Sequence, residues 1–156
     1  MNERMPEFEN RRFDPDLTPF HGLAKQMAGA FGYTADLAID RELAQLLRLR
    51  VAQVNTCSYC LILHSKAARE HGIEDARIDN LTSWWESDLY SPAEQAALAY
   101  CEALTDGRPR DFDVAHRRAR EIFTDREIAE IAAVTINMNV WTRLKLAQGA
   151  TPVFVD

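Results

Sequence analysis

Two cysteines and a histidine lie within eight residues of this sequence, as Cys57, Cys60 and His64 in the segment NTCSYCLILHSKAAREHG. Thiol and imidazole groups so close together are typical of metal centres and of redox-active dithiols, and they also occur as buried structural side chains. The only other cysteine, Cys101, stands among apolar residues in AALAYCEAL and is interpreted as part of the core. The chemistry of the chain therefore depends on how the first three side chains are arranged.

Helical geometry limits what this triplet can bind. At positions i, i+3 and i+7 the side chains share one face, but Cys57 and His64 are separated by ~10 Å of axial rise. One zinc ion, which holds its ligands at ~2.0 to 2.3 Å, cannot reach both. A metal bound by Cys60 and His64, with ligands from elsewhere, remains an alternative. His71, just before Gly72, is interpreted as a residue that interacts favourably with the C-terminal end of the helix dipole.

A redox pair fits the pattern better. The first turn of a helix offers unpaired N–H groups and a positive dipole end, which stabilise a thiolate in a Cys-x-x-Cys pair. Once one sulfur is oxidised to sulfenic acid, a thiol one turn away can condense with it to a disulfide. His64, four residues after Cys60, can accept or return a proton during that cycle. A thioredoxin site is disfavoured because a helix precedes the motif, and a c-type haem site because Leu61 follows Cys60.

The elements that position these residues are all predicted to be helices. In DRELAQLLRLRVAQVN the apolar residues recur at helical spacing, and Asp40 is available as the N-cap. Asn55 and Thr56 are the expected caps of the cysteine helix, and Gly72 ends it. SPAE at 91–94 and TDRE at 124–127 are capping-box sequences. Helices are expected at about 17–31, 40–55, 57–71, 74–83, 92–104, 113–122 and 124–149.

Length and composition predict one all-α domain. The chain has 156 residues, of which 47% are hydrophobic and 27% charged, enough for a single core. Residues 1–16 are polar and are expected to form an arm over the surface or a neighbouring subunit, with the domain over 17–156. The net charge of −6 disfavours binding to nucleic acid or anionic membranes. Because the N-terminus lacks an apolar signal segment, we expect a cytoplasmic protein without structural disulfides.

The segment LLRLRVAQVNTCSYCLILHSKAAREHG resembles the core motif of the alkylhydroperoxidase D-like proteins in the carboxymuconolactone decarboxylase superfamily. The resemblance extends into SPAEQAALAYCEALT and FTDREIAEIAAVTINMNVWTRL, and so covers about residues 17–148. It implies an all-α, single-domain alkylhydroperoxidase D-like helical bundle that assembles as a homotrimer or hexamer. It also implies an antioxidant, peroxiredoxin-type enzyme, which reduces hydroperoxides through its paired cysteines. No metal or organic cofactor is expected, and the reductant would be an external dithiol of lipoyl or thioredoxin type.

The resemblance also implies roles for single residues. Cys60 is expected to attack the peroxide, Cys57 to resolve the product as a disulfide, and His64 to take part in a proton relay. That relay usually begins with a glutamate twelve residues before the first cysteine, where this chain has Gln45. An amide can orient a histidine but cannot take its proton. Glu42, three residues earlier on the same helix face, is therefore the candidate substitute.

Two rival functions remain open at this point. The decarboxylase or lactone-ring chemistry of the superfamily's other branch does not call for a cysteine pair, so CSYC argues against it. A non-catalytic redox sensor, whose disulfide state controls assembly, would carry the same motif. Only turnover distinguishes such a sensor from a peroxidase.

Five further polar or aromatic residues have no assigned chemistry. The tryptophans carry large apolar areas and are expected in the core or at a subunit interface rather than around the substrate: Trp84, Trp85 and Trp141. Asn137 and Asn139 need hydrogen-bond partners if they are buried. They are expected either to bind a neighbouring helix or to line the cysteine pocket.

Overall fold

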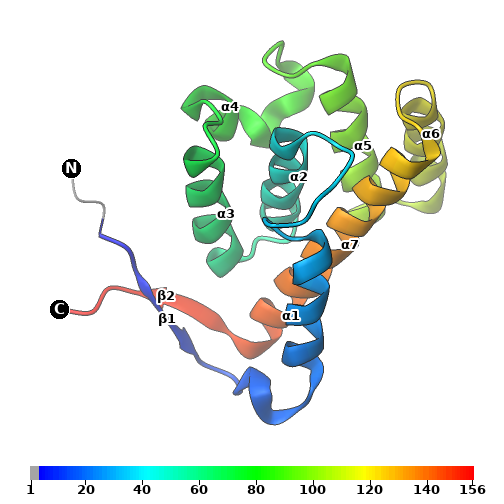
Figure 1. The fold of residues 1–156 in the computed structure, drawn as a ribbon. Coiled ribbons are helices and arrows are strands. Elements are labelled where there is room, and N and C mark those ends of the chain that lie inside the picture. Colours follow the sequence, from blue (N-terminus) through cyan, green and yellow to red (C-terminus); the bar gives the residue numbers. More distant parts are fainter. Residues whose placement is uncertain (1–3) are drawn as a thin grey trace.

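The computed structural model describes residues 4–156, which form a helical bundle with one short pair of strands (Figure 1). The helices are α1 (Phe20–Phe31), α2 (Arg41–Val54), α3 (Ser58–Glu70), α4 (Asp75–Asn80), α5 (Pro92–Asp106), α6 (Pro109–Arg120) and α7 (Asp125–Gln148). The strands are β1 (Glu7–Asn10) and β2 (Ala150–Val153), and 3-10 turns span Pro15–Leu17 and Leu81–Glu86. No helix within this described range is long and apolar enough to cross a membrane. The predicted all-α bundle is confirmed, and the strand pair is an addition to it.

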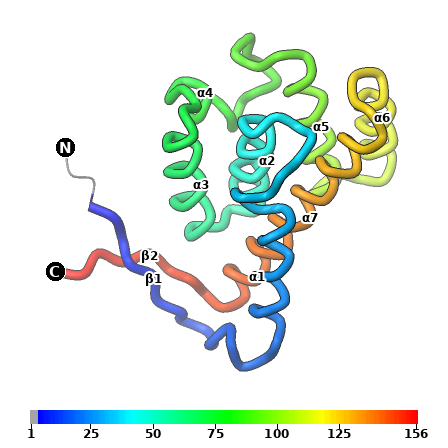
Figure 2. Tube along the Cα trace, in the orientation of Figure 1, coloured from blue at the N-terminus to red at the C-terminus, as the bar shows by residue number. Residues whose placement is uncertain are grey.

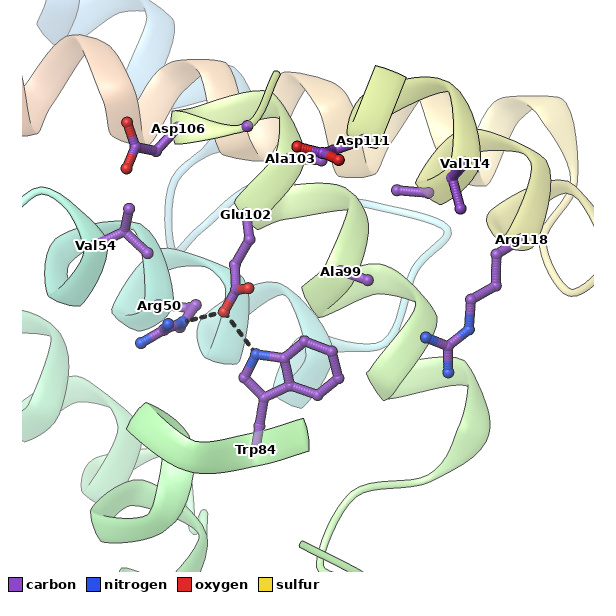
Figure 3. Close-up of a pocket in the computed structure, with 12 residues that line it drawn as sticks. Arg50, Val54, Trp84, Ala99, Glu102, Ala103, Asp106, Asp111, Val114 and Arg118 are labelled. Carbon is purple, nitrogen blue, oxygen red and sulfur yellow. Dashed lines mark hydrogen bonds and ion pairs between the residues drawn. The ribbon is translucent and has the colours of Figure 1, made fainter. Parts of the chain in front are cut away.

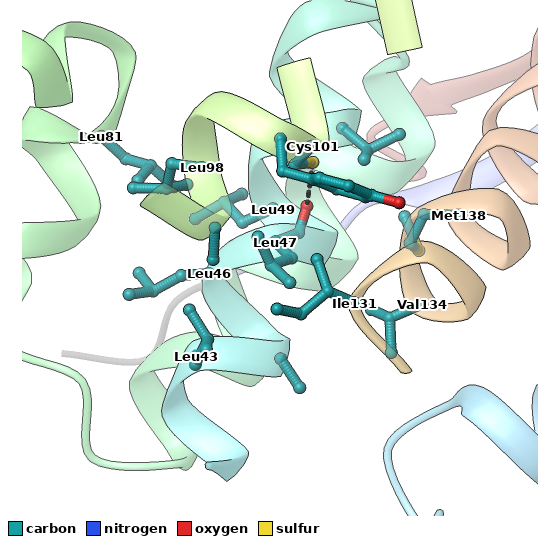
Figure 4. Close-up of a cluster of buried hydrophobic side chains, with 14 of the residues drawn as sticks. Leu43, Leu46, Leu47, Leu49, Leu81, Leu98, Cys101, Ile131, Val134 and Met138 are labelled. Carbon is teal, nitrogen blue, oxygen red and sulfur yellow. Dashed lines mark hydrogen bonds between the residues drawn. The ribbon is translucent and has the colours of Figure 1, made fainter. Parts of the chain in front are cut away.

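Helix α2 lies at the centre of the bundle, with α3, α5 and α7 packed around it (Figures 1 and 2). Its leucines at 46, 47 and 49 point in different directions around the helix, and all are fully buried. They meet Leu98 of α5 and Ile131 of α7 in the main core (Figure 4). Cys101 is also fully buried there, in agreement with its prediction as a core residue. A helix that is buried on nearly every side is a fixed support for the polar side chains it carries.

The predicted helix starts are confirmed at three places. Asp40 caps α2 by accepting a hydrogen bond from the backbone N–H of Leu43. Capping boxes begin α5 and α7, and in each a hydroxyl and a carboxylate bind one another's backbone N–H groups. The residues of these boxes are Ser91 with Glu94, and Thr124 with Glu127.

Three helices differ from the prediction at their ends, and the first is α1, which begins at Phe20 rather than at residue 17. Helix α6 begins at Pro109, four residues before the expected start, because proline suits the first helical position and the Asp111 carboxylate accepts a hydrogen bond from the backbone N–H of Arg108. The helix expected over 74–83 stops at Asn80 and continues as the 3-10 turn over 81–86. The last two differences lie away from the start of α3, which carries the cysteine motif (Figure 1).

The predicted N-terminal arm contains β1, which pairs antiparallel with β2 so that Glu7 lies opposite Val153 (Figure 2). Gly149 ends α7 with φ of 70°, a left-handed conformation that turns the chain into β2. The ring of Phe8 packs on Tyr59 at the start of α3, with 4.6 Å between ring centroids. No strand was expected, because four residues are too few to show an alternating pattern. The division of the chain at residue 16 stays a prediction.

Candidate functional site

The cysteine motif occupies the start of α3. Cys57 is the N-cap, and its Sγ accepts a hydrogen bond from the backbone N–H of Cys60 at 3.3 Å. The predicted caps are therefore wrong, because Asn55 ends α2 and Thr56, with φ of 51°, forms the tight turn between the helices. Sulfur here takes the place of the usual capping oxygen. As a result, the first thiol lies at the positive end of the helix dipole.

Both cysteines are free and buried, and their Sγ atoms are 2.8 Å apart. The hydrogen bond between the sulfurs lowers the pKa of Cys57 despite its burial, and the backbone N–H of Cys60 and the charge of Lys145 act in the same direction. The same hydrogen bond, together with burial and the charge of Cys57, raises the pKa of Cys60. The pair therefore loses one proton readily and keeps the second. Because the sulfurs already touch, a disulfide can form with little movement of α3.

A cavity of about 360 Å³ opens beside this pair. Cys60 and His64 line it, whereas Cys57 does not. The walls are mainly apolar, and its volume is in the range of small-molecule sites. Three aromatic side chains from different parts of the chain contribute to it: Tyr33, Tyr59 and Trp141. A small apolar molecule in the cavity can therefore meet the thiol of Cys60 but not that of Cys57.

Three side chains hold the His64 ring in a hydrogen-bond network. Arg48 Nη1 donates to Gln45 Oε1 at 3.2 Å. Gln45 Nε2 lies 3.4 Å from His64 Nδ1 and also donates to the carbonyl of His64 at 3.1 Å. The hydroxyl of Tyr33, in the loop after α1, lies 2.9 Å from the same Nδ1. Gln45 and Arg48 both come from the buried helix α2 at the centre of the bundle.

This network fixes the tautomer of His64. A guanidinium group can only donate, so Arg48 faces the amide oxygen of Gln45 and turns the amide N–H groups toward the imidazole. Nδ1 therefore accepts, and the proton of the neutral ring is on Nε2. Burial, assisted by the positive charge of Arg48, lowers the pKa of His64 to about 3. At physiological pH the ring is neutral, and its free nitrogen is an N–H donor rather than a base.

Lys145 supplies a positive charge near the two thiols. Its Nζ lies 4.5 Å from the ring centroid of Tyr59 and 5.6 Å from that of Trp141. The residue is buried, and its charge favours the thiolate forms of both cysteines. In the sequence it is one lysine in an ordinary helix, so only the packing of α7 against α3 reveals it. Tyr33 and Arg48 were missed for the same reason, because nothing in their local sequence points to His64.

Glu42 lies outside this network. Its carboxylate accepts a hydrogen bond from Arg77 Nη1 at 3.2 Å, and Arg77 also pairs with Glu94 of α5. The Glu42 side chain is 46% exposed and has no hydrogen bond to His64 or Gln45 among the described residues. The structure thus brings Gln45, but not Glu42, to the imidazole.

The two asparagines of α7 have different surroundings. Asn137 lines the cavity beside Cys60, and its buried Oδ1 has no hydrogen-bond partner in the described part of the chain. Asn139 instead donates to the Thr105 hydroxyl and accepts from Asn55 Nδ2, which ties α7 to α5 and to the end of α2. The first is a pocket residue and the second is structural.

A second cavity, of about 540 Å³, lies between α2, α5 and α6 and shares no residue with the first (Figure 3). Glu102 projects into it and accepts hydrogen bonds from Arg50 Nε and Trp84 Nε1, both at 2.6 Å. Trp84 is buried as expected, whereas Trp85 is 57% exposed. Trp141 lines the cysteine cavity. Residues 4–156 contain no cluster of three His, Cys, Asp or Glu side chains that could hold a metal ion.

Comparison with known sequences places this site in a family. The model of the carboxymuconolactone decarboxylase family matches residues 22–103. The uncharacterised protein YdfG of Bacillus subtilis is 34% identical over 118 residues, which are 75% of this chain and 80% of YdfG. The uncharacterised protein YnjA of Escherichia coli is 26% identical over 109 residues, or 70% of this chain and 60% of YnjA.

Solved structures with the same fold confirm the predicted alkylhydroperoxidase D-like bundle. A protein of unknown function from Agrobacterium tumefaciens matches with a TM-score of 0.83 and 22% identity, over 94% of this chain and all of that one. A peroxidase-related protein with an alkylhydroperoxidase AhpD core, from Ralstonia eutropha, matches with a TM-score of 0.71 and 20% identity over 85% of this chain and 70% of its own. The debrominase Bmp8 matches with a TM-score of 0.69 and 23% identity, over 88% of this chain and 71% of Bmp8.

Proposed function

We propose that this chain, which belongs to the carboxymuconolactone decarboxylase family, is a thiol-dependent hydroperoxide reductase. The observation that carries the proposal is the position of Cys60, which lines the cavity while its Sγ lies 2.8 Å from that of Cys57. A hydroperoxide in the cavity meets one thiol, and the second thiol is in place to close a disulfide. Proteins of this fold that are described as peroxidase-related support the same assignment.

The first step uses the proton that the cysteines share. In the resting pair the negative charge favours Cys57 and the proton stays on Cys60. Transfer of that proton across the 2.8 Å between the sulfurs makes Cys60 the thiolate and leaves Cys57 as the thiol. Cys60 then attacks the terminal oxygen of the hydroperoxide, and the O–O bond breaks. The products are a sulfenic acid on Cys60 and an alkoxide.

The second step closes the disulfide. The alkoxide takes the sulfenic acid proton of Cys60 and leaves as an alcohol, and the proton of Cys57 replaces it, which restores the Cys57 thiolate. That thiolate attacks the sulfur of the Cys60 sulfenic acid, and the displaced hydroxide takes a proton from solvent to become water. An external dithiol, of the lipoyl or thioredoxin type, reduces the disulfide by exchange. In this scheme Cys57 takes the proton of Cys60, a role that the Gln45 amide cannot perform.

His64 contributes as a hydrogen-bond donor in this scheme. It lines the cavity, and its Nε2–H is the free group of the ring. A donor placed before the reaction begins stabilises negative charge that develops on the leaving oxygen. No protonation of the imidazole is required, which agrees with the low pKa of this buried ring.

The two cysteine variants test the assignment. Consumption of cumene hydroperoxide and hydrogen peroxide should stop in Cys60→Ser, because the only cavity-lining thiol is lost. Cys57→Ser should react once, more slowly because the base is lost, and leave a sulfenic acid that dimedone traps on Cys60. Cys101→Ala is the matched control, since this buried thiol lies in the core, and it should keep full turnover. The reverse pattern for the first two variants would exchange the roles of Cys57 and Cys60.

Turnover number separates an enzyme from a redox sensor. With dithiothreitol, dihydrolipoamide or a thioredoxin system in excess, the peroxidase should consume many equivalents of hydroperoxide per chain. A sensor consumes one equivalent and stops as the disulfide. A single-equivalent result with every dithiol would therefore reject the proposed enzyme.

Thiol-dependent reductive dehalogenation is a second candidate. The aromatic walls of the cavity favour it, since they suit a flat, apolar aromatic ring next to Cys60. Replacement of a carbon–bromine bond by carbon–hydrogen takes two electrons and a proton, which the dithiol supplies as it becomes the disulfide and bromide leaves. The structurally similar debrominase Bmp8 has been crystallised with 2,3,4-tribromopyrrole. Bromide release from that compound under excess dithiothreitol, compared with peroxide consumption in the same preparation, discriminates between the two activities.

A further inference from the structure

Arg48 is a buried cation without an acidic partner. Its side chain belongs to a residue only 4% exposed, on the fully packed helix α2. Nη2 donates to the carbonyls of Phe31 and Gly32, at 3.1 and 2.9 Å, and Nη1 donates to the Gln45 amide. All these acceptors are neutral. Burial lowers the pKa of Arg48 to about 10, so the guanidinium is still charged at physiological pH.

Other arginines with largely covered side chains in this chain are neutralised. Arg50 pairs with Glu102, and Arg77 pairs with both Glu42 and Glu94. Arg48 forms no ion pair within residues 4–156, and Tyr33 is the one titratable neighbour whose charge affects its pKa. A buried charge without a partner is costly, and proteins retain one mainly where a ligand or a reaction uses it.

Two cavities meet at this guanidinium. Arg48, Tyr33 and Thr34 line both the apolar cavity beside Cys60 and a third, more polar cavity of about 260 Å³. The polar cavity also carries Arg41 and His71, with Asp36 as its one carboxylate. The Nε–H of Arg48 is buried and has no hydrogen-bond partner in the described structure. The guanidinium therefore lies in the wall shared by both cavities and keeps one N–H donor that no described residue accepts.

We propose that Arg48 binds the carboxylate of the substrate, and that the preferred substrates are amphipathic organic hydroperoxides with a carboxylate group, such as fatty acid hydroperoxides. The apolar part would occupy the cavity beside Cys60, and the carboxylate would neutralise the guanidinium at the junction with the polar cavity. This inference rests on the proposed peroxidase function for the reaction, but the anion site itself does not depend on turnover. Gln45 is essential to it, because a carboxylate at that position would neutralise Arg48 internally.

A binding experiment without peroxide tests the site directly. Octanoate and octanamide share one apolar chain and differ in charge, and Trp141 in the cavity wall is a fluorescence reporter, with calorimetry as the second readout. The wild-type chain should bind octanoate at least tenfold more tightly than octanamide at pH 7.5. The preference should disappear in Gln45→Glu, which places a carboxylate beside Arg48, and in Arg48→Gln. Arg41→Gln is the matched control, because this exposed arginine lines only the polar cavity, and it should keep most of the preference.

Each outcome has a defined meaning. Equal binding of octanoate and octanamide to the wild-type chain overturns the inference. It is also overturned if the octanoate preference survives in Gln45→Glu, or if Arg41→Gln rather than Arg48→Gln abolishes it. If Arg48→Gln fails to fold, the wild-type comparison and the Gln45→Glu variant still test whether the anion site exists. Turnover of cumene hydroperoxide without any preference for the carboxylate rejects the anion site and leaves the peroxidase intact. A carboxylate preference in a chain that turns over no hydroperoxide supports the anion site and rejects the peroxidase.

Discussion

The substitution Gln45→Glu should convert His64 from an N–H donor into a base. In the native chain the amide N–H of Gln45 faces Nδ1, so the imidazole is neutral with its proton on Nε2. A carboxylate in the same place would accept from Nδ1–H and from Arg48 at once. The tautomer would then reverse, and the nitrogen on the cavity side would carry a lone pair.

The size of the change follows from the distance between the two groups. Gln45 Nε2 and His64 Nδ1 are 3.4 Å apart. A unit negative charge at ~4 Å contributes ~4 kcal/mol at an effective dielectric constant of ~20, which is about 3 pKa units. The pKa of His64, now about 3, should therefore rise to about 6. Because the group is buried, solvent screening reduces this value less than it would at the surface.

Stability against pH reports this shift without any assay of function. A histidine whose folded pKa is lowered destabilises the native state as pH falls below its unfolded value of ~6.5, because only the unfolded chain takes the proton. Between pH 7 and 5 the His64 contribution should cost the native chain ~1.9 kcal/mol but the variant only ~0.5 kcal/mol. Urea unfolding at both pH values measures the difference, and NMR titration of the imidazole measures the pKa itself.

Peroxidase kinetics provide the functional readout of the same variant. Above pH 6 the new base should raise the rate at limiting hydroperoxide by ~10²-fold, the low end of general-base effects. Gln45→Met, which removes the amide without adding charge, is the control and should not gain activity. If His64 of the native chain titrates between pH 5 and 7, or if Gln45→Glu loses as much stability as the native chain, the tautomer argument is refuted.

Three other outcomes follow from the described contacts. Glu42→Gln should leave the peroxidase rate within about twofold, since its carboxylate pairs with Arg77; an inactive variant would make Glu42 the relay carboxylate after all. Alkylation of the native chain by iodoacetamide should show a midpoint below the ordinary thiol pKa of ~8.5, because the pKa of Cys57 is lowered by its hydrogen bond with Cys60; a midpoint at or above that value contradicts the shared-proton scheme. Gly149→Ala should reduce the free energy of unfolding by ~1 to 2 kcal/mol in urea denaturation, since φ is 70° there, and an unchanged stability would show that the end of α7 adapts.

The helices could be predicted because their signals are local. A capping residue and its partner are three positions apart, so Asp40 and the box of Ser91 and Glu94 predict where α2 and α5 begin whatever surrounds them. The strand pair has no such signal, because β1 and β2 lie at opposite ends of the chain and each has four residues. Their pairing depends on the direction in which α7 ends, which only the folded structure determines.

The residues of the site also fall into two groups, those that the local sequence predicts and those that only tertiary packing brings in. The spacing of Cys57, Cys60 and His64 is local and predicts their common face on one helix. Arg48 and Tyr33 enter the site only because α2 packs on α3 and the loop after α1 covers both. Arg48 is also one of several arginines in the sequence, and its lack of an acidic partner can be recognised only when all its neighbours are known.

Gln45 links the two proposals. In the sequence alone, this position suggests only the loss of a proton-accepting carboxylate, because an amide replaces the glutamate with which the family relay usually begins. In the structure the amide accepts from Arg48 and donates to Nδ1 of His64, while burial and the charge of Arg48 keep the ring neutral. A glutamate there would supply a base and would neutralise Arg48 at the same time. With Gln45 the chain lacks the carboxylate base and keeps Arg48 without an acidic partner among the described residues. In the proposed scheme no carboxylate base is needed, because Cys57 takes the proton of Cys60.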